Sequence, residues 1–374
     1  MTKKFYMPTR VFMGYECIAK NCEAFKTLGK KALIVTGASS AKKNGSEHDV
    51  KAALDSVGIS YLVFDKVMSN PTIACVYEGA KVAKENDVDF IIAIGGGSPM
   101  DAGKAIALLA AQDIDAANLF SGNYENKVLP IAFVPTTAGT GSEVTQYSIL
   151  TNDEKQTKTS IASDLLFPAL AFLDAKYMEY LSISTTINTA LDALSHAVEG
   201  MLSVKASSVS NALAVESIQL IMECVPDLLS VLNSKSKTGL ELEVREQLQQ
   251  ASFMAGMVIA QTGTTAVHAM GYSLTYFKDI DHGRGNGLLL GEYLRIVERE
   301  QPDLAGRILK ALSLSSVNEF REITDKLLGE KEDISTDEIQ QFSKMAIQTK
   351  NIANCIVKPS EDDLKEIFIL SFLM

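Results

Sequence analysis

DFIIAIGGGSPMDAGK, from Asp89 to Lys104, indicates a buried strand, a glycine-rich turn and the start of a helix. Asp89–Ile94 is a short apolar run, as in strands that are covered on both faces of a sheet. Ser98 is a good N-cap and Pro99 suits the first position of a helix, which we expect over Met100–Ala111. The stretch therefore predicts a strand–turn–helix unit of a parallel α/β sheet.

The same alternation of apolar runs and amphipathic segments fills the first half of the chain. Expected strands are Lys31–Thr36, Tyr61–Phe64, Asp89–Ile94 and Pro130–Pro135, and further expected helices are His48–Val57 and Ile73–Asn86. We therefore predict an α/β domain over residues 1–182, built on a parallel sheet that helices cover on both faces.

From about Ser184 onwards, apolar residues recur at three- and four-residue spacings and strand-like runs largely disappear. The helical segments expected here are Ser184–Val204, Ser208–Cys224, Leu240–Gln261 and Val317–Leu328. We predict an all-helical domain over residues 183–374. A chain of 374 residues is long for one hydrophobic core, which also favours two domains.

Composition excludes several classes of protein. A net charge of −11 argues against a nucleic-acid or anionic-membrane partner. The five cysteines are scattered and form no C-x-x-C pair, which is typical of reduced thiols in a cytoplasmic protein. The charge-free stretch Gln247–Phe277 is interrupted by polar residues, so we expect a buried helix pair there and no membrane span.

The glycine turn of Gly95–Ser98 is suited to a diphosphate, because glycines allow close approach of the backbone and a helix N-terminus attracts anions. It matches neither G-x-x-x-x-G-K nor G-x-G-x-x-G, and a tight turn without a ligand is the alternative. A second loop, PTTAGTGSEVT (Pro135–Thr145), mixes hydroxyls with glycines after another strand; here the alternative is a flexible connector. Two such loops at the carboxyl ends of parallel strands fit a nucleotide crevice.

Three of the four histidines fall in two short segments. Asp192 and His196 are four residues apart, on one face of a helix, and His268 and His282 lie in a second segment. A carboxylate with imidazoles suits a divalent ion such as iron or zinc. The alternative for Asp192 and His196 is a surface ion pair, but the concentration of histidines in so histidine-poor a chain favours a metal site. His48, in a polar stretch, stands apart.

Four motifs in this order resemble the iron-containing (group III) alcohol dehydrogenase family. They are GGGSPMD (Gly95–Asp101), PTTAGTGSE (Pro135–Glu143), DALSHAVE (Asp192–Glu199), and HAM from His268 with HGRGN from His282. The resemblance implies an α/β dinucleotide-binding domain and an all-α domain, an architecture shared with dehydroquinate synthase. It also implies a metal and a nicotinamide between the domains, and hydride transfer between an alcohol and an aldehyde or ketone.

The resemblance also implies roles for single residues. Asp192, His196, His268 and His282 match the metal ligands, and the cofactor contacts are matched by Asn70, Gly96, Gly97, Ser98, Asp101, Thr136, Thr137, Thr140 and Lys158. The expected metal is Fe²⁺, with Zn²⁺ as the alternative. We expect a short-chain alcohol or aldehyde as substrate, of the butanol, propanol or 1,3-propanediol type, and a homodimer or larger homo-oligomer.

Two positions depart from the family. Tyr272 stands where many members have a histidine with a role in proton transfer, so Tyr272 is a candidate for proton relay or substrate contact; packing is the alternative. Gly37 stands where NAD-preferring relatives have aspartate, and Ser39, Ser40 and two lysines follow it. We therefore expect NADP(H) to be preferred; acceptance of NAD(H) as well is the alternative.

Three other functions fit parts of the pattern. A glycerol-dehydrogenase-like zinc enzyme does not need all four ligands, so His196 favours the iron type. A dehydroquinate-synthase-like lyase requires a cluster of basic residues, and none accompanies the metal motifs. A catalytically inactive protein would have no reason to keep every ligand and cofactor motif.

Overall fold

The chain forms two compact units that divide after Tyr180. The structure is a computed structural model that describes residues 4–234 and 239–373. The α/β unit is Met7–Tyr180, and the helical unit begins at Leu181. The described residues before Met7 belong to the helical unit. The reason is local, because the backbone of Tyr6 and the side-chain amide of Gln261 exchange two hydrogen bonds of 2.8 Å.

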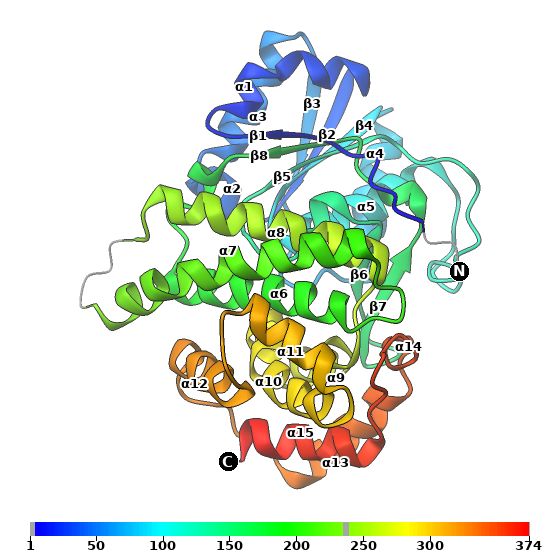
Figure 1. Ribbon diagram of the computed structural model, residues 1–374. Coiled ribbons are helices and arrows are strands. Elements are labelled where there is room, and N and C mark those ends of the chain that lie inside the picture. Colours follow the sequence, from blue (N-terminus) through cyan, green and yellow to red (C-terminus); the bar gives the residue numbers. More distant parts are fainter. Residues whose placement is uncertain (1–3, 235–238, 374) are drawn as a thin grey trace. The chain divides into compact units, whose positions relative to one another are not determined.

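The α/β unit is built on a six-stranded sheet in which every neighbouring pair is parallel (Figure 1). In spatial order its strands are β1 (Arg10–Met13), β8 (Leu170–Leu173), β5 (Ile131–Pro135), β4 (Phe90–Gly95), β2 (Lys31–Thr36) and β3 (Ser60–Phe64). The helices of this unit are α1 (Cys17–Lys20), α2 (Ser40–Lys43), α3 (Ser46–Ser56), α4 (Ile73–Glu85) and α5 (Gly97–Ala111).

The central strand β4 is buried on both faces. Successive side chains of a strand point to opposite faces. Phe90 and Ile92 therefore join the core that includes residues of α1 and α3, whereas Ile91 and Ala93 join the core that includes residues of α4 and α5. This two-sided burial is why the strand reads as a continuous apolar run.

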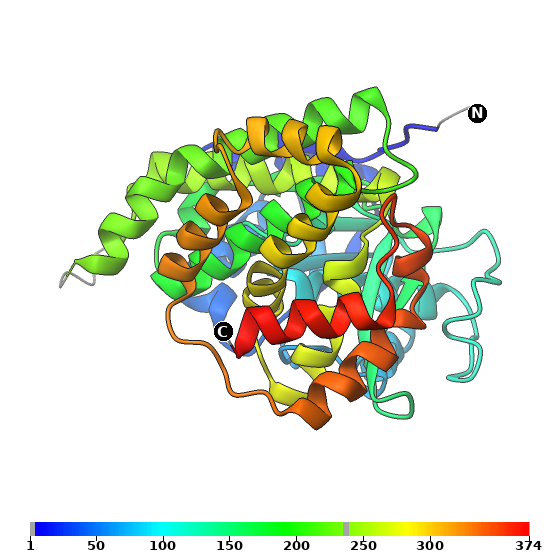
Figure 2. The same ribbon diagram turned by 60° about the horizontal axis from the view of Figure 1, so that its bottom comes forward.

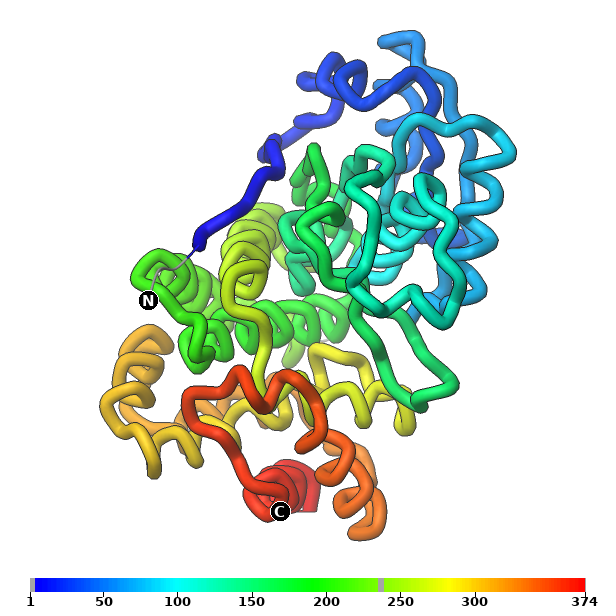
Figure 3. Tube along the Cα trace, turned by 90° about the vertical axis from the view of Figure 1, so that its right-hand side faces the viewer, coloured from blue at the N-terminus to red at the C-terminus, as the bar shows by residue number. Residues whose placement is uncertain are grey.

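Some elements of this unit depart from the sequence-based prediction. The edge strand β1, the strand β8 and the antiparallel hairpin β6 (Tyr147–Asn152)–β7 (Thr157–Ala162) were not expected. Figure 3 shows the hairpin, in blue-green, extending from the sheet-bearing part of the unit. β1 and β8 have four residues each, too few for a periodic signal, and β7 is largely polar.

Helix α5 also begins earlier than predicted. The prediction that Ser98 is its N-cap is wrong, because the N-cap is Gly96 and the helix starts at Gly97. The Ser98 hydroxyl instead accepts a hydrogen bond of 3.2 Å from the backbone N–H of Asn70.

The second unit is built of helices in its described residues, with one isolated antiparallel β-bridge between Ser203 and Cys355. Its helices are α6 (Ile183–Met201), α7 (Ser208–Asn233), α8 (Leu242–Thr262), α9 (Ala266–Lys278), α10 (His282–Glu300), α11 (Pro302–Ala311), α12 (Val317–Leu328), α13 (Thr336–Ile347), α14 (Lys350–Ala353) and α15 (Glu361–Phe372). Figure 2 shows α15, in red, next to α13, in orange. In residues 4–234 and 239–373, no helix combines the length and apolar character that crossing a membrane requires. The predicted fold class, a Rossmann-like α/β domain with an all-α domain, is confirmed.

Helix α6 lies at the centre of this unit, packed against α7, α8 and α10. Gly283, in the first turn of α10, allows the closest approach. A Cβ atom added there would lie 2.0 Å from the Asn188 carbonyl oxygen and 3.0 Å from the Asp192 Cβ, both on α6. Any larger residue would push α10 away from α6. The side chain before it, His282, would move with the helix.

We expect Gly283→Ala to lower the free energy of unfolding by about 1–3 kcal/mol, because the clash is with backbone that cannot rotate away. Urea unfolding followed by circular dichroism measures this change. Gly306→Ala is the matched control, since a Cβ on Gly306 in α11 meets no atom within 4 Å. That variant should be neutral or slightly stabilising. An equal loss of stability in both variants would contradict the packing argument.

Candidate functional site

Strands β2 and β4 lie side by side, but their chain connections run in opposite directions across the sheet. From β2 the chain passes outward to β3, and from β4 it passes to β5 on the other side. Such a reversal of strand order leaves a crevice outside the carboxyl ends of the two strands, where nucleotides bind in sheets of this kind. The segment after β2 contains Gly37, Ser39 and Ser40, and the segment after β4 is the glycine turn.

The glycine turn and the threonine-rich loop pack against each other. Gly95 has φ +147°, which disfavours a side chain, and its carbonyl accepts a hydrogen bond of 2.9 Å from the Thr136 N–H. A Cβ on Gly96 would lie 3.0 Å from Thr137 Oγ1, and one on Gly97 would lie 2.7 Å from Thr140 Cγ2. The two loops that sequence analysis singled out are therefore one surface.

Asn70 completes this surface beside the glycine turn. Its φ of 57° is left-handed, which asparagine tolerates better than most residues. Its N–H donates to Ser98, and its carbonyl accepts a hydrogen bond of 3.0 Å from the Thr151 hydroxyl on β6. The structure thus brings Asn70 to the glycine turn.

A buried lysine that sequence analysis left without a role secures the threonine-rich loop. Lys104 of α5 is fully buried, and its Nζ lies 2.7 Å from the Ser142 carbonyl, 2.8 Å from the Ser142 hydroxyl and 2.8 Å from the Tyr147 carbonyl. Burial lowers the pKa of Lys104 to about 8, although neighbouring Asp101 and Glu143 oppose that shift. Lysine in an otherwise apolar helix face was the sequence signal for this anchor.

Asp101 belongs to the same anchor. Its carboxylate accepts hydrogen bonds of 2.8 Å from the Ser142 hydroxyl and 3.2 Å from the Ile149 N–H. Burial raises its pKa, against the opposing effects of Lys104 and of Lys158 on β7, so Lys158 is within electrostatic reach of Asp101.

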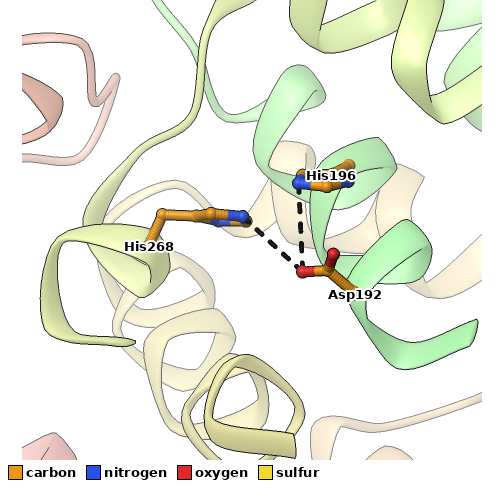
Figure 4. Close-up of side chains that lie close together, drawn as sticks. All are labelled: Asp192, His196 and His268. Atoms are coloured by element: carbon orange, nitrogen blue, oxygen red, sulfur yellow. Dashed lines mark ion pairs between the residues drawn. The ribbon is translucent and has the colours of Figure 1, made fainter. Parts of the chain in front are cut away.

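The metal-ligand candidates converge in the helical unit. Asp192 and His196 lie one turn apart on α6, and His268 lies in the first turn of α9; all three are buried. Figure 4 shows both imidazoles directed at the same carboxylate. Asp192 Oδ1 is 3.9 Å from His196 Nε2 and 3.8 Å from His268 Nε2. The alternative of a surface ion pair is wrong, because these side chains are inside the unit.

The fourth candidate, His282, lies beside this group at the start of α10. Its ring centroid is 5.1 Å from that of His268. Asn286, one turn further along α10, lies among the candidates: its Nδ2 is 3.0 Å from Asp192 Oδ1, 3.2 Å from His268 Nε2 and 3.3 Å from His282 Nε2. Asn286 is fully buried, and sequence analysis gave it no role.

The donor set fits a divalent ion. The ligand atoms of Asp192, His196 and His268 all lie within 4.8 Å of one another. Bonds of roughly 2.0–2.2 Å from nitrogen and oxygen ligands to one ion place such atoms roughly 3–4 Å apart. Burial acts to raise the pKa of Asp192, but the neighbouring histidines and the Asn286 amide outweigh it and lower that pKa, so the ionised carboxylate is favoured.

Comparison with known proteins decides the family. The sequence model of the iron-containing alcohol dehydrogenase family matches residues 8–175. The sequence model of the C-terminal part of the Fe-containing alcohol dehydrogenase family matches residues 186–372. The chain belongs to the iron-containing alcohol dehydrogenase family. The resemblance of its four motifs is thereby confirmed.

Relatives and solved structures of this family cover most of the chain. A 1,3-propanediol dehydrogenase of Citrobacter freundii is 35% identical over 295 residues, 78% of this chain and 74% of the relative. An NAD-dependent methanol dehydrogenase of Bacillus methanolicus is 31% identical over 287 residues, 76% and 73% of the two chains. The crystal structure of an iron-containing alcohol dehydrogenase from Thermotoga maritima is 37% identical, with a TM-score of 0.91 and full coverage of both chains.

These findings establish an alcohol oxidoreductase of the iron-containing family, and they support a metal ion together with a nicotinamide cofactor. Because the matching family models and these relatives are alcohol dehydrogenases, they favour an iron-containing dehydrogenase over a dehydroquinate-synthase-like lyase or a catalytically inactive protein.

Tyr272, the candidate for proton relay or substrate contact, stacks on a metal-ligand candidate. Its ring centroid is 5.7 Å from that of His282, and the two rings are within 5° of parallel. Tyr272 follows His268 by one turn of α9, which explains how it reaches the same place.

Proposed function

We propose that the protein interconverts short-chain alcohols and aldehydes, with a divalent ion held by Asp192, His196, His268 and His282. The observation that carries this proposal is the buried convergence of the first three ligands, whose donor atoms lie within 4.8 Å of one another. The position of His282 beside His268 supports its inclusion.

The division of labour follows from the chemistry of the two bound groups. The ion would supply a Lewis acid for the alcohol or carbonyl oxygen, and the nicotinamide would carry the hydride. The surface formed by Asn70, Gly96 and Gly97 would hold the diphosphate with backbone N–H groups at the start of α5. Thr136, Thr137, Thr140 and Lys158 are the remaining proposed contacts, and Asp101 acts through the loop that it anchors.

The substrate proposal rests on relatives that act on small alcohols, a diol and methanol among them. A carboxylate with three imidazoles accepts either Fe²⁺ or Zn²⁺, and we propose Fe²⁺ on family grounds. Metal analysis of the purified protein combined with a screen of short alcohols, diols and aldehydes, followed by nicotinamide absorbance, tests this proposal. Stoichiometric metal without turnover of any of them would contradict it.

His268→Ala and His282→Ala should each abolish turnover and weaken metal binding, because each removes one of four ligands. Metal content after dialysis against a chelator, measured beside activity, checks this expectation. His48→Ala is the matched control, because His48 is exposed on α3 and belongs to the other unit. Full activity and unchanged metal content in either ligand variant would refute the site.

The cofactor preference is proposed to be NADP(H), with NAD(H) also accepted. The segment after β2 offers Gly37 and the exposed hydroxyls of Ser39 and Ser40, with no carboxylate of its own. Lys42 of α2 is exposed and paired with Asp65 at 2.7 Å, so a 2′-phosphate would share the lysine with that carboxylate. The methanol dehydrogenase of Bacillus methanolicus is NAD-dependent, so a kinetic comparison of the two cofactors is the test of this preference.

Gly37→Asp should shift the preference from NADPH towards NADH, because a carboxylate repels the 2′-phosphate and accepts from a free 2′-hydroxyl. A Cβ at Gly37 would lie 3.3 Å from the Val67 carbonyl, so the backbone need shift only slightly. Gly37→Ala controls for that shift without adding charge. The measurement is the ratio of kcat/KM for NADPH to kcat/KM for NADH. A wild-type ratio that favours NADH would contradict the proposal.

We also propose that the Tyr272 phenol contacts the substrate or delivers a proton beside the metal. The stacking of its ring on His282 supports this placement. Packing alone remains the competing account, since a tyrosine ring also fills space between helices.

Tyr272→Phe keeps the stacked ring and removes only the hydroxyl. A proton-transfer role predicts a fall in kcat of roughly 10²-fold or more and an altered pH profile of kcat. Tyr276→Phe, on the same helix but against Phe277, is the matched control. Unchanged kcat, KM and pH dependence in Tyr272→Phe would leave packing as the better account.

A further inference from the structure

Helix α6 carries a second carboxylate on the same face as the metal-ligand candidates. Glu199 follows Asp192 by seven residues and His196 by three, a spacing that aligns all three side chains along one stripe of the helix. Its side chain is fully buried. A buried carboxylate is costly unless its oxygens accept hydrogen bonds, so its partners indicate what it does.

One oxygen of Glu199 caps the start of α9. Oε1 accepts from the Thr265 N–H at 2.9 Å, the Thr265 hydroxyl at 2.7 Å, the Val267 N–H at 3.1 Å and the His268 N–H at 3.4 Å. Thr265 is the N-cap residue of α9, and its own side chain makes no capping bond. The carboxylate from α6 therefore serves the backbone donors that this helix end leaves unpaired.

The other oxygen of Glu199 holds the imidazole of His268. Oε2 lies in hydrogen-bonding contact with His268 Nδ1. The ring then turns its Nε2 towards Asp192 Oδ1, 3.8 Å away. A carboxylate that accepts at Nδ1 keeps the proton on that nitrogen, whether the ring is neutral or charged. Nε2 is then the nitrogen whose lone pair is available to a metal ion.

We propose that Glu199 is a positioning residue of the metal site, which fixes the tautomer and the orientation of His268 so that Nε2 binds the ion. Partners of this kind raise the basicity of a ligating imidazole, and their loss typically weakens metal binding about 10–100-fold. The inference rests on the proposed function, since it takes His268 to be a ligand.

A purely structural role, as a helix cap, is the competing explanation, and Glu199→Gln separates the two. The Gln carbonyl oxygen can still accept from the N-terminal donors of α9, so the cap is retained. Its amide nitrogen then faces His268 Nδ1 as a donor, so that Nδ1 must accept and the proton moves to Nε2. A metal ion has to displace that proton, whereas the hydrogen bonds of the helix cap do not depend on where the ring proton lies.

The experiment measures Co²⁺ affinity of the full chain by chelator competition, followed by the visible absorption of the bound ion. We expect Glu199→Gln to bind Co²⁺ about 10–100-fold more weakly than the wild type. Glu292→Gln is the matched control, because Glu292 is an equally buried carboxylate of the helical unit whose partners are Arg295 and Arg321. Co²⁺ affinity in that variant should stay at the wild-type value.

The outcomes distinguish this inference from the function on which it rests. Wild-type Co²⁺ affinity in Glu199→Gln, together with loss of binding in His268→Ala, would overturn the role of Glu199 and leave the four-ligand site standing. Unchanged binding in His268→Ala as well would refute the metal site itself.

A second measurement decides the matter if Glu199→Gln does not fold. The chain has only four histidines, so selective ¹⁵N labelling of histidine gives a simple spectrum of the Zn²⁺-loaded wild type. We expect the His268 ring, assigned by comparison with His268→Ala, to carry its proton on Nδ1 and the ion on Nε2. A proton on Nε2 would overturn the inference.

Discussion

Two buried carboxylates on one face of α6, those of Asp192 and Glu199, constrain how the helical unit packs. An ionised carboxylate inside a protein costs several kcal/mol unless charge or hydrogen bonds compensate. Asp192 is compensated by histidines and by the amide of Asn286, and Glu199 by His268 and the start of α9. Apart from His196, which lies on α6 itself, these partners come from α9 and α10, so the packing of those helices on α6 also assembles the site.

The close packing of α10 on α6 depends on a glycine next to the site. Gly283 permits van der Waals contact between the first turn of α10 and the backbone of α6. His282 immediately precedes it, and Asn286 follows by three residues; the Asn286 amide donates to Asp192 Oδ1 and also lies 3.3 Å from His282 Nε2. The motif HGRGN therefore determines helix packing as well as supplying a proposed ligand.

Sequence reasoning reached the residues whose chemistry is local. The prediction was close for the strands β2, β4 and β5 and for the helix α6. Burial on both faces and helical periodicity can be recognised from residues that are neighbours in the sequence. The convergence of His268 with Asp192 was predicted from the concentration of histidines in two short segments and from the resemblance to a family, since nothing local joins residues so far apart in the chain.

Residues that act through contacts distant in sequence were missed. Glu199 and Asn286 carry ordinary polar side chains on helices, and only the packing of three helices shows what they touch. Lys104 gave a weak signal as a lysine in an apolar segment, but its acceptors lie about forty residues further along the chain. The start of α5 was misplaced because Ser98 is engaged by Asn70 rather than by its own helix.

The most direct test of the account is to locate the metal ion. Crystals of the protein grown with Fe²⁺ or Zn²⁺, measured on both sides of the absorption edge of that metal, would give its position from anomalous scattering. The account predicts one peak within about 2.3 Å of an Asp192 carboxylate oxygen and of a ring nitrogen of His196, His268 and His282. A fully occupied peak elsewhere, or one bound by fewer than these four side chains, would contradict it.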